Sequence, residues 1–340
     1  MSLLPYFPRG SILSFQLRRA LGIGLSTLKH NLYVASFRRM FDECAVDAAD
    51  SLVLHSPHDF HASALIAVIA ERPAVHRPVA HIRVLDAGPF VEAMHPDLLA
   101  HLAAIAEDRV FFYAETASTA AALAARLFDR RVDLLRLQIT PRRAAPLRAD
   151  RMAVTQIATI LLNLGDVREE KGCRRLASIA QALPKTVGRV SLRLVAHIGA
   201  VARGDRKLAD RVVADLAATG VEIVSGRLSD GEMTGLLEGV DVAVMPYTSD
   251  RYRLRGSGIG PELVMHGVPL VVSAGSVLTE HVAGQNGLSA AGDGEFATAV
   301  CRILADYPAY AAAARSAAHS LLAECESSPL FERLKSAEAA

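Results

Sequence analysis

The residues best suited to bind an anion lie between Gly256 and Glu262, where a buried strand and a loop lead into a short helix. Gly256, Ser257 and Gly258 precede Pro261, which fits the first turn of a helix because no backbone donor is lost there. Free backbone N–H groups and the positive end of the helix dipole would face the preceding loop. The pattern therefore predicts an anion site, with phosphate as the best-matched anion.

A second group of charges follows another predicted strand, in the segment GDVREEKG at residues 165–172. Arg168 offers a forked, permanently charged set of donors, whereas Lys171 offers a mobile point charge. Together the two side chains suit a diphosphate. The alternative is a solvated turn in which Glu169 and Glu170 neutralise both bases.

Three histidines, His55, His58 and His61, surround the predicted end of a strand in the segment VLHSPHDFHASALIA. An imidazole offers one hydrogen-bond donor and one acceptor near neutral pH, which suits contact with a polar substrate. A shared metal ion is an alternative, but it would need all three residues on one helix, and the strand-to-loop transition spoils that geometry. A further alternative is that the histidines cap the following helix.

Three segments resemble a known family. The stretch Asp241–Ser273 resembles the carboxyl-terminal domain of a GT-B-fold glycosyltransferase and is most similar to the retaining group called glycosyltransferase family 4. In that stretch PELVMHGVPLVV matches the family pattern EAxAxGxPVV. GDVREEKG resembles its GxxxxxKG loop, and HDFH resembles the HDWH of glycogen-synthase-like members. The resemblance covers residues 156–304 well and residues 51–139 loosely.

The resemblance implies which residues bind a nucleotide-sugar donor. The donor diphosphate would lie between the cations of GDVREEKG and the loop Gly256–Gly258, and Glu262 would hold the ribose. The nucleotide base would touch the turn of Arg227 and Leu228, largely through its backbone.

The resemblance also bears on catalysis. His61, and after it His58, would contact the transferred sugar, because the order DFH matches the family's DWH. Leu254 stands where the family carries a glutamate near that sugar, eight positions before Glu262. This difference leaves a non-catalytic alternative open.

The elements that would position these residues alternate between strand and helix, which predicts parallel sheets flanked by helices. The expected strands are Ser51–Leu54, Val79–Leu85, Arg109–Tyr113, Leu134–Ile139, Gln156–Leu164, Val190–His197, Val221–Val224, Val240–Met245 and Leu270–Val272. The clearest expected helices are Ala62–Ala70, Thr116–Phe128, Lys207–Thr219, Asp230–Glu238, Glu295–Asp306 and Tyr310–Glu324. Only four strands are evident in the first half, which lacks the opening strand and glycine-rich turn of the family.

We therefore predict an α/β protein of the GT-B type, with two Rossmann-like parallel-sheet domains facing a cleft and a shortened amino-terminal domain. The acceptor-side domain would span residues 1–148 and the nucleotide-sugar-binding domain residues 149–322. A carboxyl-terminal helix at 323–340 could return to the first domain. The proline- and arginine-rich segment Pro141–Met152 is the expected linker.

Composition argues against several other classes. The chain has 37 basic and 36 acidic residues, so its charge does not indicate a nucleic-acid partner. Four cysteines without CxxC spacing indicate thiols in a reducing compartment. No uncharged run is long enough to span a bilayer. The chain also lacks a GxxxxGK[ST] loop and the Asp-x-Asp motif of metal-dependent transferases, and its GSGIG segment is a weak dinucleotide signal.

The first 41 residues contain six basic residues and no acidic one, interleaved with leucine and phenylalanine. Such a basic amphipathic segment could lie on an anionic membrane surface, as in family 4 enzymes that act on lipid-linked acceptors. The alternative is a pair of helices packed on the first domain, with the arginines in solvent.

The sequence thus predicts a cytoplasmic glycosyltransferase, with peripheral contact at the inner face of the membrane as an open alternative. It would move a sugar from a nucleotide-diphosphate sugar to a saccharide or lipid-linked acceptor, in polysaccharide or glycolipid synthesis. No metal or cofactor is expected, because the nucleotide sugar is itself a substrate, and retention of configuration is implied only by the resemblance. The alternatives are a non-catalytic nucleotide-sugar-binding or partner subunit and, third, a sugar-nucleotide epimerase.

Overall fold

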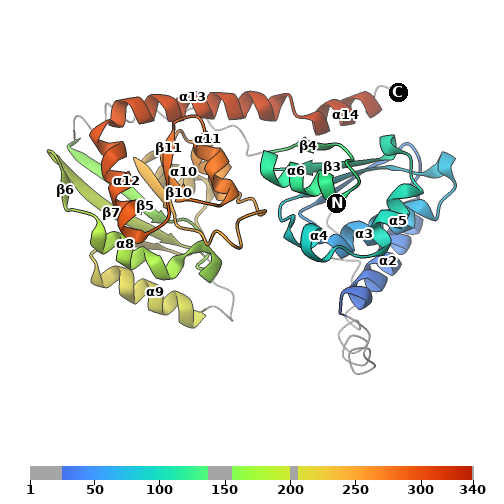
Figure 1. Ribbon diagram of the computed structural model, residues 1–340, viewed down its shortest axis with the longest axis horizontal. Coiled ribbons are helices and arrows are strands. Elements are labelled where there is room, and N and C mark those ends of the chain that lie inside the picture. Colours follow the sequence, from blue (N-terminus) through green and yellow to red (C-terminus); the bar gives the residue numbers. More distant parts are fainter. Residues whose placement is uncertain (1–24, 137–154, 200–205, 339–340) are drawn as a thin grey trace. The chain divides into compact units, whose positions relative to one another are not determined.

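The computed structural model describes residues 25–136, 155–199 and 206–338, and these form two compact units (Figure 1). Unit 1 contains the described residues up to Leu135 and those from Ser327 onward, and unit 2 contains those between Arg136 and Glu326. Both units are α/β. The linker expected at Pro141–Met152 lies outside the described residues.

Unit 1 is built on a parallel sheet with strand order β1-β2-β3-β4. Its strands are β1 (Ser51–His55), β2 (Val79–Val84), β3 (Val110–Ala114) and β4 (Val132–Leu134). Its α-helices are α2 (Leu25–Glu43), α3 (Asp59–Ala70), α4 (Gly88–Ala93), α5 (Asp97–Ala103), α6 (Ala117–Arg126) and α14 (Pro329–Glu338). Each strand pairs with the one before it, so the described sheet has no reversal of strand order, in keeping with a shortened domain.

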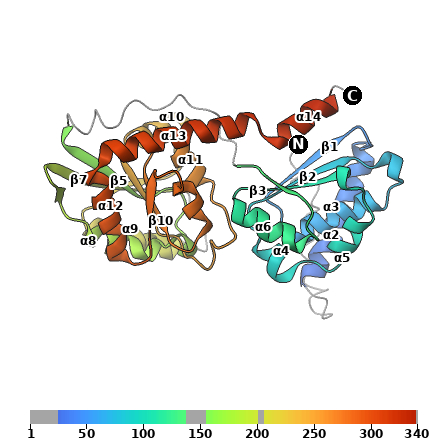
Figure 2. The ribbon, with the colours of Figure 1, turned by 45° about the horizontal axis from the view of Figure 1, so that its top comes forward.

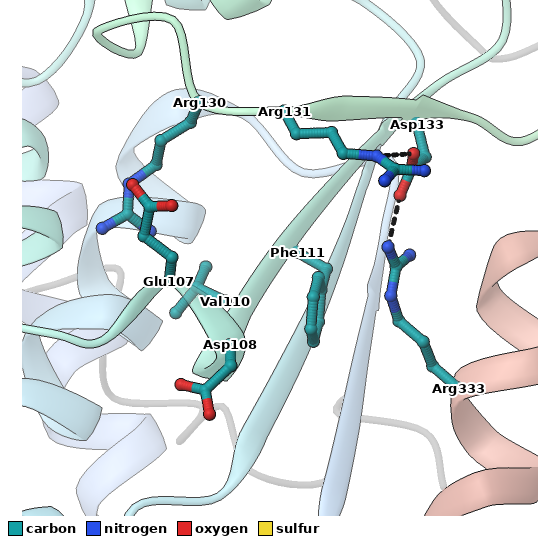
Figure 3. Close-up of a pocket in the computed structure, with 8 residues that line it drawn as sticks. All are labelled: Glu107, Asp108, Val110, Phe111, Arg130, Arg131, Asp133 and Arg333. Carbon is teal, nitrogen blue, oxygen red and sulfur yellow. Dashed lines mark hydrogen bonds and ion pairs between the residues drawn. The ribbon is translucent and has the colours of Figure 1, made fainter.

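The fourth strand corrects the expectation of a strand at Leu134–Ile139, because it begins earlier, at Val132. Asp133 allows this, since its buried carboxylate accepts hydrogen bonds at 2.6 Å from both Arg131 Nε and Arg333 Nη2. A charge is tolerated inside a strand when it is paired in this way. Figure 3 shows the two arginines converging on Asp133, with Arg333 arriving from the helix α14.

Arg333 also fixes α14 on one face of the sheet. Its guanidinium donates to the Tyr113 hydroxyl at 3.0 Å and lies 4.2 Å from the centre of the Phe111 ring. Tyr113 is fully buried and packs with Leu330 of α14. Figures 1 and 2 show α14 and the helices α3 to α5 on opposite faces of this sheet. The last described helix of the chain therefore helps to close unit 1.

Helix α2 contains the described part of the basic amino-terminal segment. Val34, Phe37 and Phe41 are buried, and α2 packs on α3. These apolar side chains stabilise unit 1 and are not available to a lipid surface. Residues 1–24 lie outside the described part, so membrane contact through them stays a prediction. Among the described helices, none combines the length and apolar character that crossing a bilayer requires.

Unit 2 is built on a sheet with strand order β11-β10-β9-β5-β7-β6, and β8 also pairs with β7. All pairs are parallel except β6 with β7. Its strands are β5 (Ile157–Asn163), β6 (Thr186–Val187), β7 (Val190–Ile198), β8 (Glu222–Ser225), β9 (Val242–Met245), β10 (Leu270–Ser273) and β11 (Gly287–Ala290). Its α-helices are α8 (Leu176–Ala182), α9 (Arg206–Ala218), α10 (Asp230–Glu238), α11 (Ile259–Met265), α12 (Asp293–Ala305) and α13 (Tyr307–Glu326).

Both faces of this second sheet are buried. From β5, Ile160 and Leu162 pack in one core with residues of α8, α9 and α12, whereas Leu161 packs in another core with residues of α10, α11 and α13. Strands that are covered on both faces carry apolar side chains at nearly every position. This explains the near-continuous apolar runs that the sequence shows at 157–162 and 242–245.

The strand order of unit 2 reverses between β5 and β9. From β5 the sheet grows through β7 to one side, and then through β9, β10 and β11 to the other. In open parallel sheets a ligand binds outside the carboxyl ends of the strands at such a reversal, because the following loops diverge there. The two segments at this point are the loop after β5, residues 164–172, and the loop after β9, residues 246–258.

Candidate donor-binding site

The loop after β5 is a rigid turn. Gly165 has φ = +87°, a conformation that favours glycine. Its carbonyl oxygen accepts hydrogen bonds from the Gly199 N–H at 3.0 Å and from Asn163 Nδ2 at 3.1 Å. Its own N–H donates to His197 Nδ1 at 3.2 Å. The start of the loop is therefore fixed by the ends of β5 and β7.

Lys171 is the buried cation of this loop. It is 5% exposed, and its Nζ lies 3.5 Å from the Leu164 carbonyl oxygen. Burial, followed by the nearby charge of Arg168, lowers the pKa of Lys171 to about 8. Because a buried ammonium is costly without partners, a bound anion here would be strongly favoured.

The loops after β5 and β9 are joined at Gly172. This residue has φ = +70°, and a Cβ added to it would lie 1.9 Å from the Pro246 carbonyl oxygen, so only glycine fits. Beside it, the Glu170 carbonyl oxygen accepts from the Thr248 N–H at 2.9 Å and from Thr248 Oγ1 at 3.3 Å. The structure thus brings together two segments that the sequence connected only through a resemblance.

The loop after β9 is less polar than its sequence suggests. Tyr247 and Tyr252 are 5% and 2% exposed, belong to the core of unit 2 and have ring centres 4.6 Å apart. The Tyr247 side chain also forms a hydrogen bond with that of Ser257. The two tyrosines therefore anchor this arginine-bearing loop and the glycine segment that follows it.

The start of α11 offers fewer backbone donors than expected. The Gly260 N–H donates to the Ser257 carbonyl oxygen at 3.0 Å, and the Glu262 N–H donates to that of Gly258 at 3.3 Å. A Cβ on Gly260 would lie 2.6 Å from the His281 ring, so the segment is also closely packed. The helix has only seven residues, so side-chain cations must supply most of the attraction for an anion.

The surroundings of Arg168 only partly match the alternative of a neutralised turn. Glu169 forms its ion pair with Arg174. Glu170 Oε1 lies 3.7 Å from Arg168 Nη1, and Asp166 Oδ2 lies 3.9 Å from Arg168 Nη2, both longer than a strong charged hydrogen bond. The buried Nε of Arg168 has no hydrogen-bond partner among the described residues. Arg168 is therefore held loosely and retains capacity to bind.

Glu262 lies in the first turn of α11, as predicted. Its side chain is 21% exposed, and Oε1 lies 3.6 Å from Nε2 of the buried His266, one turn further along the helix. The carboxylate can therefore act in a helix-stabilising pair or accept hydrogen bonds from a ligand. Its predicted contact with a ribose stays a prediction.

The turn expected to touch the base lies between β8 and α10, with Arg227 exposed and Leu228 half-buried. No role was predicted for His197, which reaches this turn. His197 is 3% exposed, and its Nε2 donates to the Gly226 carbonyl oxygen at 2.9 Å while Nδ1 accepts from Gly165. One imidazole thus joins the predicted base turn to the predicted diphosphate loop. Its place at the carboxyl end of a predicted strand was the only available signal.

The histidines His58 and His61 lie in unit 1, at the start of α3. His61 Nδ1 accepts a hydrogen bond from the His58 N–H at 3.0 Å, so His61 caps the helix. Its ring also packs against Tyr33 of α2, with ring centres 4.0 Å apart. Burial, followed by the charges of His58 and Lys29, lowers the pKa of His61 to about 4. His61 is therefore neutral at pH 7, with Nε2 carrying the hydrogen and available only as a donor.

The capping geometry predicts how His61 variants behave. His61→Ala should lower the free energy of unfolding by about 0.5–2 kcal/mol, because the cap is lost. His61→Gln should retain most of that stability, because glutamine at this third helical position can reach back to the His58 N–H. Chemical denaturation and donor turnover should be measured together. Full activity in the stable Gln variant would contradict a role for the imidazole in sugar transfer.

A cluster of polar side chains lies at the carboxyl ends of the unit 1 strands. Arg83 Nη2 lies 3.4 Å from Glu115 Oε2, and the two side chains are 5% and 1% exposed. Arg83 Nη1 is 3.4 Å from the ring nitrogens of His55, and Arg83 Nε donates to the Leu135 carbonyl oxygen at 3.2 Å. This network ties together the ends of all four strands. Over the described residues, no group of three or more His, Cys, Asp or Glu side chains could hold a metal ion.

Two cavities lie away from these sites. One, of about 270 Å³, is lined by residues at the amino-terminal ends of β3 and β4 and by Arg333 (Figure 3). The other, of about 730 Å³, lies near the amino-terminal ends of β5 and β7. Parallel sheets bind ligands at the opposite ends of their strands. We therefore place the candidate site at the meeting of the loops after β5 and β9.

This chain is similar to known proteins in its three-dimensional structure. No protein-family model matches the sequence. No curated protein matches it either. Sucrose-phosphate synthase from Thermosynechococcus elongatus superposes with a TM-score of 0.65 at 16% identity, over 92% of this chain and 79% of that one.

Two further solved structures are similar. An alpha,alpha-trehalose-phosphate synthase (UDP-forming) from Burkholderia vietnamiensis has a TM-score of 0.62 at 16% identity, over 91% of this chain and 79% of its own. HepE from Anabaena, solved in complex with UDP, has a TM-score of 0.61 at 12% identity, over 89% and 82%. The solved proteins that are similar to this chain have the GT-B fold, so the predicted GT-B fold class is confirmed. At these identities the likeness establishes the fold alone.

Proposed function

We propose that this protein is a glycosyltransferase that takes its sugar from a nucleotide-diphosphate donor bound in unit 2, between the loops after β5 and β9. The observation that carries the proposal is the buried Lys171 beside the loosely held Arg168, at the point where the strand order reverses. These two cations would stabilise the negative charge that develops on a departing diphosphate. The solved proteins of similar fold include sucrose-phosphate and UDP-forming trehalose-phosphate synthases, which supports this reaction class.

The same proposal assigns binding sites to the ribose, the base and the acceptor. Glu262 would hold the ribose, and the turn of Arg227 and Leu228, tied back by His197, would lie under the base. The acceptor would be a saccharide, alone or lipid-linked, bound by unit 1. Membership of family 4, retention of configuration and independence from metal ions rest on the motif resemblance. So does a place in polysaccharide or glycolipid synthesis, whereas a cytoplasmic location rests on the spacing of the four cysteines.

A non-catalytic nucleotide-sugar-binding subunit is the second candidate, and Leu254 favours it. This half-buried apolar side chain stands where the resembling family has a glutamate. An aliphatic side chain can neither bind a sugar hydroxyl nor stabilise positive charge on the reacting sugar.

Calorimetry with UDP, GDP and their nucleosides, followed by mass spectrometry of each donor sugar with candidate acceptors, separates these candidates. The transferase should bind a nucleoside diphosphate at least tenfold more tightly than the nucleoside, since hydrogen bonds to charged groups contribute about 1.5–3 kcal/mol each. It should also form a glycosylated product. Diphosphate binding without product would support the binding subunit, and equal binding of nucleoside and diphosphate would refute both.

A further inference from the structure

A second arginine, Arg255, approaches the carboxylate that faces Arg168. Glu170 Oε1 lies 3.7 Å from Arg168 Nη1 and 3.9 Å from Arg255 Nη1. One carboxylate oxygen is thus placed between two guanidinium groups from the two loops that meet at the candidate site. Strong charge-assisted hydrogen bonds are about 2.7–2.9 Å long, so neither contact is a tight pair.

The backbone of Glu170 is fixed although its side chain is not tightly paired. Its carbonyl oxygen is held by both Thr248 donors, whereas its side chain is 29% exposed. The carboxylate can therefore rotate away from the arginines without disturbing the loop. A ligand anion could take its place.

Arg255 is positioned by the buried aromatic pair. Its guanidinium carbon lies 5.5 Å from the centre of the Tyr252 ring, and its side chain is 20% exposed. Tyr252 is in turn fixed against Tyr247. A cation near the face of an aromatic ring is attracted to it and loses little freedom on binding a ligand. Burial is the main cause of the lowered pKa of Lys171, and the charge of Arg255 adds a smaller contribution in the same direction.

We propose that Arg255 is a third cation of the diphosphate-binding site, and that the Glu170 carboxylate holds Arg168 and Arg255 in place until the ligand diphosphate displaces it. The inference rests on the proposed function and adds to it a residue and an internal competitor. Arg168, Lys171 and Arg255 carry three positive charges, opposed by Asp166 and Glu170. A diphosphate that replaces Glu170 restores charge balance around the buried lysine.

Calorimetry on the full-length protein with UDP and with inorganic pyrophosphate tests the proposal. Arg255→Met should weaken both ligands roughly tenfold and leave uridine unchanged, as expected for one lost charged contact. Arg253→Met, an exposed arginine of the same loop, is the matched control and should change affinity less than about twofold. Arg255→Lys keeps the charge and should recover part of the loss. An equal effect of Arg255→Met and Arg253→Met would overturn the proposal.

The role of Glu170 is tested by Glu170→Gln, which keeps the size of the side chain and the carbonyl contact with Thr248. Diphosphate affinity should rise about threefold to tenfold, because the ligand no longer competes with a carboxylate. The gain should shrink when Arg255 is already Met. Weaker binding by Glu170→Gln, or a gain that is independent of Arg255, would refute the displacement. If the wild-type protein binds neither UDP nor pyrophosphate, the proposed function fails as well; if it binds both, only this inference is at stake.

Discussion

Replacing Lys171 by Met is expected to weaken UDP binding at least tenfold and, at the same time, to make the protein more stable at pH 7. The loss of affinity follows because a charged contact to the diphosphate, of about 1.5–3 kcal/mol, disappears. The gain in stability follows because Met fills a similar volume without placing a charge in a site that is 5% exposed.

The gain in stability on Lys171→Met should depend on pH, because burial lowers the pKa of Lys171. The pKa of Lys171 is about 8 in the folded protein and 10.5 ordinarily. Below pH 8 both states bind the proton, and the folded state alone carries the cost of burying it. Between pH 8 and 10.5 the folded state releases the proton first, so the wild-type protein gains stability as the pH rises. The advantage of Lys171→Met, about 1–3 kcal/mol at pH 7, should therefore shrink toward zero by pH 10.5.

Denaturation with urea at several pH values, together with calorimetry using UDP and uridine, checks both parts. Lys185→Met is the matched control, because Lys185 is an exposed lysine of the same unit. It should change neither quantity beyond about 0.5 kcal/mol. A Lys171→Met protein that is destabilised yet binds UDP normally would show that the lysine is structural.

Replacing Glu262 by Gln is expected to lower UDP affinity roughly tenfold to a hundredfold, because Gln only partly replaces a carboxylate that accepts from both ribose hydroxyls. The 2′-deoxy nucleotide should bind the wild-type protein poorly and lose less on mutation. The two ligands and two proteins form a double-mutant cycle whose coupling term measures the hydroxyl contact. Calorimetry supplies all four affinities.

The neighbouring His266 provides the control for this experiment. If Glu262 serves only its 3.6 Å contact with His266 and the start of α11, then Glu262→Gln should cost about 0.3–1 kcal/mol of stability and show no ligand coupling. The part of that stability loss that comes from the contact with His266 should vanish when His266 is already Gln. Coupling to the 2′-hydroxyl that persists in His266→Gln would assign the carboxylate to the ribose.

Much of the fold could be predicted from the sequence, because its signals extend over only a few residues. Helix α10 begins and ends where predicted, at Asp230 and Glu238, since Ser229 and Glu232 form a capping box within one turn. The apolar runs that became β5 and β9 are buried on both faces, and such strands need no partner to be recognised. The charges of GDVREEKG and the position of Glu262 before a short helix were likewise evident from local spacing.

What the tertiary structure decided depends on contacts between residues far apart in the chain. The sequence could not show that Gly172 meets Pro246, because that contact requires β9 to pair with β5, on the side opposite β7. It could not show that Tyr247 and Tyr252 are core residues, since a loop is buried only when neighbouring elements cover it. It also could not decide whether Glu169 and Glu170 together neutralise Arg168 and Lys171. Adjacent side chains point in different directions where the backbone turns, so Glu169 pairs with Arg174 and Glu170 lies near Arg168.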